Sequence, residues 1–292
     1  AVADVAAMRD LLTSAKFGFP KKNVRVLTNS DATRARIESE FKSFLIASAE
    51  KSRNAVVVFM YSGHGSQKID TNGDEADGLD ETLVPIDSDL QKGNRDIVDD
   101  ELGEWLDQLA QYTSNATFIL DSCHSGTVTR GTPAVKMREI KRDLRAAAAK
   151  TRGAGPREAV GMGGGARYAT FAACRSDQSA CETKPGLPHY GLMTFYLLQY
   201  LRTERPGETC RELMDKVARA VEGDVATQTP QYDGGNDKLV FGGTATDLDS
   251  YFSVKSIEGT VLTLNAGAAQ GISQGAYLAV YASRRPTKGM LP

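Results

Sequence analysis

The sequence predicts an α/β protein built around a mostly parallel central sheet. Two apolar runs, residues 55–60 (AVVVFM) and 116–120 (ATFIL), each lead directly into a polar loop that contains glycine and serine. Segments with apolar residues at helical spacing surround both runs, so strands and helices alternate along the chain. Alternation of this kind is typical of a parallel sheet flanked by helices.

The remaining elements of this fold follow from the same patterns. We expect helices over stretches with helical periodicity or a capping aspartate, namely 4–17, 33–52, 99–108 (capped by Asp99 or Asp100), 191–202 and 209–222. We expect two further strands, at 24–27 and 169–173. Residues 66–98 are predicted to form a long loop around the short apolar run at 82–86.

The pattern changes after Gly242 and Gly243. Short β-type segments separated by Gly and Asn turns follow, at 251–254, 260–264 and 276–282. We therefore predict a large α/β domain over residues 1–243 and a small β-rich C-terminal domain over residues 244–292. Within the first, a large part runs to about residue 130, a basic segment covers 131–167, and a small part covers 168–243.

Composition restricts the class of protein. Of the 292 residues 41% are hydrophobic and 25% are charged, which is ordinary for a globular protein, and the net charge of -2 gives no sign of nucleic-acid binding. No apolar run approaches the ~20 residues that span a bilayer. Four cysteines in a chain of this length do not form a disulfide framework. We therefore expect a cytoplasmic protein that binds neither nucleic acid nor membrane.

A histidine and a cysteine follow the two apolar runs. His64 lies in Tyr-Ser-Gly-His-Gly (61–65), and Cys123 lies in Asp-Ser-Cys-His-Ser-Gly (121–126). Reactive groups of open α/β sheets gather beyond the carboxyl ends of the strands, so the two side chains meet if these strands are neighbours. A thiol beside an imidazole is a nucleophile with its base. The alternative, that Cys123 is a small buried hydrophobe, suits Cys174 and Cys210 better.

The two motifs, taken together and in order, resemble the catalytic signature of metacaspases and of their bacterial counterparts, the orthocaspases. The acidic stretch at 70–87, the VDDEL at 98–102 and the YATFAAC at 168–174 are also similar to metacaspase sequence. The resemblance covers about residues 1–240 and implies a caspase-like fold. Such folds begin with a central strand before the first helix, whereas this sequence opens inside a helix, so we expect the native protein to be longer.

The resemblance implies a cysteine endopeptidase with Cys123 as nucleophile and His64 as base. Backbone N–H groups of Gly65 and Cys123 would form the oxyanion hole. Asp4 and Asp121, with Ser62 nearby, match positions that line the primary specificity pocket, and an acidic pocket selects Arg or Lys at the cleaved bond. For Asp4 the alternative is a solvated helix residue.

A calcium site is a further implication. Residues 70–104 hold thirteen acidic and two basic residues, and a hard cation would relieve their repulsion. The metacaspase pattern indicates Asp80, Asp99 and Asp100 as ligands, together with an aspartate where this chain has Arg130. Both readings stay open: a calcium site, or aspartates that only cap a helix. The chemistry itself requires no cofactor.

The basic segment offers bonds that an Arg/Lys-specific protease would cut. Residues 131–152 contain seven Lys or Arg and two acidic residues, so we expect self-processing there, although solvated charges on an exposed helix explain the same pattern. We expect protein or peptide substrates and a monomer.

Two rival functions remain. A cysteine phosphatase needs Cys-x5-Arg, but six residues separate Cys123 from Arg130. An inactive caspase-fold scaffold or calcium-responsive interaction protein would normally have lost His64 or Cys123, and both are present.

Overall fold

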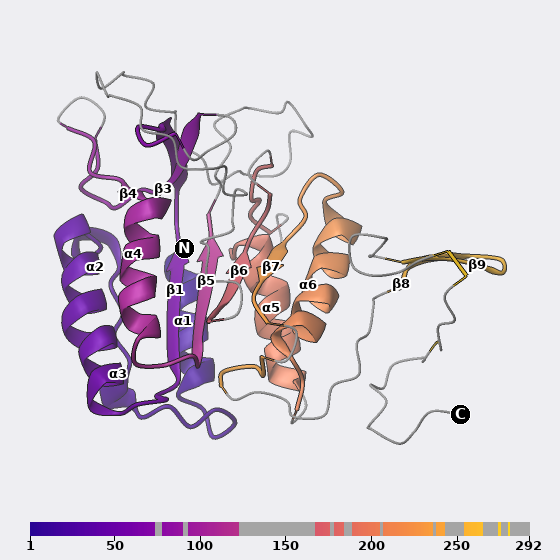
Figure 1. Cartoon of the computed structure of the whole chain (residues 1–292), viewed down its shortest axis with the longest axis horizontal. Helices are drawn as coiled ribbons and strands as arrows, with labels where there is room; N and C mark the ends of the chain where they lie inside the picture. Colours follow the sequence, from indigo (N-terminus) through magenta and orange to yellow (C-terminus); the bar gives the residue numbers. More distant parts are fainter. Residues whose placement is uncertain are drawn as a thin grey trace. The chain divides into compact units, whose positions relative to one another are not determined.

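A computed structural model describes most of the chain, and Figure 1 shows its elements. The described residues are 1–73, 78–89, 93–122, 167–175, 178–183, 189–204, 207–235, 238–242, 254–264, 274–275 and 280. The chain divides into two compact units, Ala1–Gly243 and Thr244–Pro292. The first unit carries both predicted motifs.

The core of the first unit is a four-stranded sheet in the order β1-β5-β6-β7. Its strands are β1 (Val57–Ser62), β5 (Ala116–Asp121), β6 (Ala169–Ala172) and β7 (Gln231–Asp233). The pairs β1–β5 and β5–β6 are parallel, and β7 pairs antiparallel with β6. The sheet is therefore mostly parallel, which confirms the predicted fold class.

Helices cover both faces of this sheet (Figure 1). One layer consists of α2 (Arg34–Glu40), η3 (a π-helical stretch, Phe41–Ile46), α3 (Ala47–Lys51) and α4 (Asp99–Ala110), and the other of α1 (Val2–Leu12), α5 (Leu192–Thr203) and α6 (Cys210–Asp224). Short 3-10 turns lie at η1 (Lys21–Asn23) and η2 (Asn29–Asp31). A capping box fixes the start of α6. The Thr209 side chain accepts a hydrogen bond from the Glu212 backbone N–H, and the Glu212 side chain accepts one from the Thr209 backbone N–H.

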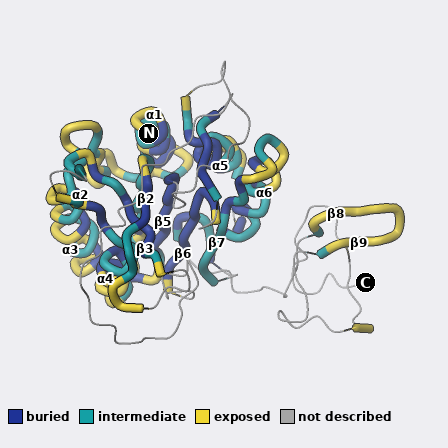
Figure 2. Tube along the Cα trace, turned by 90° about the horizontal axis from the view of Figure 1, so that it is seen from above, coloured by how far each residue is buried: buried dark blue, intermediate teal, exposed yellow. Residues whose placement is uncertain are grey.

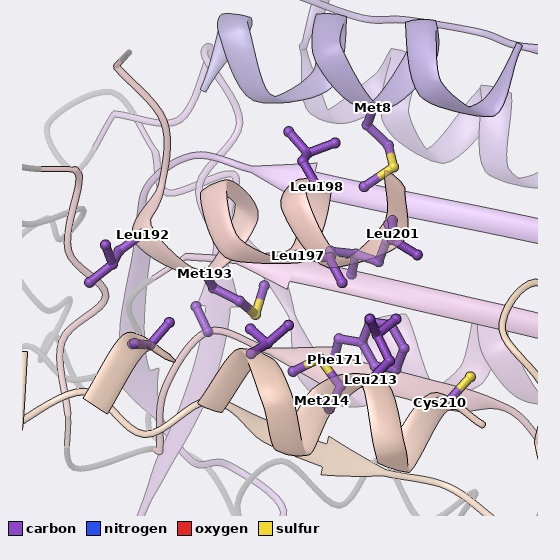
Figure 3. Close-up of a cluster of buried hydrophobic side chains, with 14 of the residues drawn as sticks. Met8, Phe171, Leu192, Met193, Leu197, Leu198, Leu201, Cys210, Leu213 and Met214 are labelled. Atoms are coloured by element: carbon purple, nitrogen blue, oxygen red, sulfur yellow. The ribbon is translucent and has the colours of Figure 1, made fainter. Parts of the chain in front are cut away.

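The first unit has two hydrophobic cores, one on each face of the sheet, and the side chains of β5 point alternately into one and the other. Phe118 and Leu120 pack toward α2, η3 and α4, whereas Ile119 packs toward α1, α5 and α6. All six residues of β5 and all four of β6 are buried, and Figure 2 colours these strands accordingly. In the core between the sheet and α1, α5 and α6, Met8 of α1 lies beside Leu198 and Leu201 of α5, and Leu213 of α6 belongs to the same cluster (Figure 3). This double burial explains why β5 is a continuous apolar run.

Residues 66–98 differ from the predicted loop. They contribute to a second, antiparallel sheet in the order β2-β3-β4, with β2 (Gly65–Ile69), β3 (Leu79–Leu83) and β4 (Ile97–Val98). The prediction was wrong because these strands bury polar side chains, including Ser66, Gln67 and Thr82, and so lack the apolar alternation that marks a strand.

Two smaller predictions were also wrong. Residues 24–27 are extended but are not paired as a strand; β1, the end strand of the described sheet order, pairs with β5. An extended segment becomes a strand only when a partner satisfies its backbone. The N-cap of α4 is Val98, without a side-chain cap, so Asp99 and Asp100 lie in the first helical turn. Acidic residues there interact favourably with the helix dipole.

The second unit contains a hairpin of β8 (Val254–Glu258) and β9 (Val261–Leu264). β9 overlaps the strand predicted at 260–264, but β8 begins at Val254, where the strand predicted at 251–254 was expected to end. Gly259, with a φ of 61°, allows the tight turn between them. Residues 251–253 and, apart from residue 280, the strand predicted at 276–282 lie outside the described residues.

Candidate active site

The histidine loop connects the two sheets. β1 ends at Ser62, His64 is exposed, and Gly65 begins β2, where it is buried opposite Leu83. The backbone carbonyl of His64 accepts hydrogen bonds from the Val84 N–H (3.1 Å) and from the Tyr61 hydroxyl (2.7 Å). The main chain at His64 is therefore held in place while its imidazole faces solvent, as a catalytic base that meets a substrate must be.

Tyr61 folds back over this loop. Its hydroxyl also lies 2.9 Å from the Val84 carbonyl oxygen, and it accepts the Val84 N–H at 3.2 Å. A Cβ on Gly63 would lie 2.8 Å from the same hydroxyl oxygen, so only glycine leaves room for the ring in this position.

The strands that carry the two motifs are neighbours, which was the condition for the two motifs to meet. β1 and β5 pair in parallel with Ser62 opposite Asp121, and the Gly63 N–H donates to the Asp121 carbonyl oxygen at 3.2 Å. His64 follows Ser62 by two residues, and Cys123 follows Asp121 by two. Cys123 itself, the predicted nucleophile and oxyanion-hole residue, lies outside the described residues, as does the predicted processing segment through residue 166.

The two predicted pocket carboxylates are fully buried. Asp4 and Asp121 are both 0% exposed. The Ser62 hydroxyl donates to Asp4 Oδ2 at 2.5 Å, and the Gly191 N–H donates to Asp4 Oδ1 at 3.1 Å. The alternative reading of Asp4 as a solvated helix residue is therefore wrong, and Asp4 and Ser62 come together as predicted.

Asp121 is held from the start of α5. Both the backbone N–H (3.0 Å) and the hydroxyl of Thr194 donate to Asp121 Oδ2. Gly191, the N-cap of α5, lies so close that a Cβ there would be 2.6 Å from Asp121 Cγ. Sequence reasoning missed Gly191, which donates to Asp4, and Thr194, which donates to Asp121. The one available signal was their position at a helix start, where unpaired N–H groups attract carboxylates.

The acidic residues predicted to bind calcium are spread over two elements. Asp80 lies within β3 and is 7% exposed, whereas Asp99 and Asp100 begin α4. Asp100 accepts a hydrogen bond from the Asn72 side-chain amide. Among the described residues no group of three or more His, Cys, Asp or Glu is arranged to hold a metal ion.

The other described cysteines lie in the core. Cys174, Cys181 and Cys210 are buried, in agreement with the reading of Cys174 and Cys210 as small hydrophobes. Burial raises the pKa of the Cys210 thiol to about 12, although the nearby Lys238 ammonium acts in the opposite direction. The Cys210 thiol is therefore a neutral packing group and not a nucleophile.

A mostly parallel sheet between two helical layers, with an exposed histidine at the end of one strand and buried carboxylates beside the next, is a caspase-like arrangement. Residues 1–241 match the caspase domain family (Peptidase_C14). The chain belongs to this family.

The relatives of known sequence carry metacaspase names. Metacaspase-3 of Arabidopsis thaliana is 29% identical over 232 residues, which cover 75% of this chain and 59% of that protein. Metacaspase-1A of Aspergillus oryzae is 39% identical over 117 residues, or 38% of this chain and 26% of that protein. The chain thus spans about three fifths of the Arabidopsis relative.

Solved structures with the same fold include a bacterial protein. Protein GSU0716 from Geobacter sulfurreducens superposes with a TM-score of 0.53 at 24% identity, over 83% of this chain and 87% of that one. No helix in the described part of the chain is long and apolar enough to cross a membrane.

Proposed function

We propose that the protein is a cysteine endopeptidase that cleaves peptide bonds after Arg or Lys. The observation that carries the specificity is the buried pair Asp4 and Asp121, beside the strand end that leads to Cys123. Two carboxylates at this place favour a cationic side chain over a neutral or acidic one, because hydrogen bonds between groups of opposite charge are stronger than those between neutral groups. The family match supports the peptidase class.

The proposed reaction is acyl transfer. His64 removes the thiol proton, and the Cys123 sulfur forms a bond to the carbonyl carbon of the substrate. The C–N bond then breaks, with His64 giving the proton to the leaving amine. Water hydrolyses the thioester, releases the new carboxyl end and restores the thiol. Backbone N–H groups of Gly65 and Cys123 stabilise the oxyanion, each worth about 3 kcal/mol in the transition state.

Three further features belong to the same proposal. The protein cuts itself within the basic segment at 131–167, acts on protein or peptide substrates, and works as a monomer in the cytoplasm. Calcium ligation through Asp80, Asp99 and Asp100 is a fourth feature, in which Arg130 stands where the metacaspase pattern has one further aspartate.

The test compares fluorogenic peptides that end in Arg, Lys or Asp, with added calcium or with chelator. We expect cleavage after Arg and Lys by the wild type and none by Cys123→Ala or His64→Ala. His189→Ala is the matched control, because His189 is also exposed and should retain full activity. Cleavage after Asp would contradict the pocket assignment. Absence of cleavage by the folded protein under every condition would favour an inactive scaffold.

A further inference from the structure

The start of α5 binds both pocket carboxylates. The Gly191 N–H donates to Asp4 Oδ1, and Thr194 donates twice to Asp121 Oδ2, once from its backbone and once from its hydroxyl. Two donors on one oxygen fix the plane and rotation of the Asp121 carboxylate. Hydrogen bonds to an ionised group are the strong ones, and the positive end of a helix adds to them.

The close approach depends on glycine. A Cβ at position 191 would lie 2.6 Å from both Cγ and Oδ1 of Asp121. That distance is shorter than any real carbon contact, so a side chain here would force α5 away from the carboxylates. Gly191 therefore allows one helix start to reach both acids.

The helix start is held independently of Asp121. The Leu192 N–H donates to the Cys181 carbonyl oxygen at 2.8 Å, and Leu192, Met193, Leu197 and Leu198 are buried in the core (Figure 3). Loss of the Thr194 hydroxyl would therefore leave α5 in place and act on the orientation of the carboxylate.

We propose that Thr194 is a specificity-determining positioning residue, which holds Asp121 in the orientation that distinguishes a cationic side chain from a neutral one of the same shape. This inference rests on the proposed function, because it assigns a role within the pocket that selects Arg or Lys. Thr194 acts through Asp121 and does not take part in bond cleavage.

The test uses matched peptides with arginine or citrulline before the cleaved bond, since citrulline has nearly the same shape without the charge. Thr194→Val removes the hydroxyl donor and retains the backbone donor and the side-chain volume. We expect kcat/KM for the arginine peptide to fall about tenfold to hundredfold, the effect of one hydrogen bond to a charged group. The fall should appear mainly in KM, and the value for citrulline should change less than about threefold.

Three variants complete the design. Thr194→Ser should restore most of the arginine preference, because it returns the hydroxyl. Thr194→Ala removes the hydroxyl without placing a methyl beside a carboxylate, and it replaces the valine variant if that protein does not fold. Thr203→Val is the control: this threonine lies in the same helix but is exposed, and its hydroxyl donates to helix carbonyls.

The outcomes separate the two proposals. An unchanged arginine-to-citrulline ratio in Thr194→Val and Thr194→Ala would overturn the positioning role while leaving the proposed function intact. Equal losses on both peptides, with a lowered Tm, would also overturn it, since that result indicates a purely structural residue. A wild-type protein without preference for arginine over citrulline would overturn both.

Discussion

The hydroxyl of Tyr61 offers a direct test of how the histidine loop is held. Tyr61→Phe removes one oxygen and leaves the ring, so the packing around it is retained. The hydroxyl contacts the carbonyls of His64 and Val84, at 2.7 and 2.9 Å, and accepts the Val84 N–H at 3.2 Å.

The magnitude follows from these contacts. A phenol has one proton, so it donates to one of the two carbonyls at a time and accepts one N–H, which makes two hydrogen bonds. Each is worth about 0.5–1.5 kcal/mol. The Val84 N–H retains its second acceptor, the His64 carbonyl, at 3.1 Å. We therefore expect a loss of about 1–2 kcal/mol in the free energy of unfolding, or ~2–8 °C in Tm for a unit of this size.

Activity should fall as well. With its backbone less constrained, His64 should occupy the productive position less often, and we expect kcat to drop about tenfold, part of the 10²- to 10⁴-fold that a positioned base contributes. Thermal unfolding and peptide cleavage would be measured side by side. Tyr112→Phe is the control, because the Tyr112 ring lies beside Arg53 and its hydroxyl is not part of this network. A Tyr61→Phe protein with wild-type Tm and wild-type kcat would refute the reasoning.

Three further predictions concern the core. Trp105→Ala should lower the free energy of unfolding in denaturant by about 3–5 kcal/mol, because the indole is 2% exposed and packs against Phe41; a loss below about 1 kcal/mol would contradict this packing. Thr209→Ala should cost about 1 kcal/mol by removing the capping box of α6, and an unchanged urea midpoint would count against that role. Cys210 should resist iodoacetamide at pH 8 in the native protein, because its pKa of about 12 keeps the thiol protonated. It should react once unfolding returns the pKa toward ~8.5. Mass spectrometry of the peptide that contains Cys210 measures the modification, and rapid labelling of the native protein would contradict the prediction.

The sequence was sufficient to predict the strands that have helices packed on both faces. The parallel strands β1 and β5 follow from continuous apolar runs, and their polar ends located His64 and Asp121. Residues 66–98 were misread because their strands bury polar side chains such as Gln67, which pairs with Glu81. Thr194 could not be found from local pattern, because its role exists only once α5 packs beside β5, 73 residues away in the chain. Tertiary contact, and not local propensity, brings Thr194 to Asp121.

Because Ser62 pairs with Asp121, a mutation in the core that alters the register of β1 and β5 should also displace the histidine loop. Each residue of a strand advances the chain by about 3.3 Å, so a slip of two residues between β1 and β5 would move the histidine loop by roughly 7 Å along its neighbour. The aromatic contact between Phe59 and Phe118, with ring centroids 6.1 Å apart, opposes such a slip. The hydrophobic core of this molecule therefore also fixes the relative position of the strand ends that lead to His64 and Cys123.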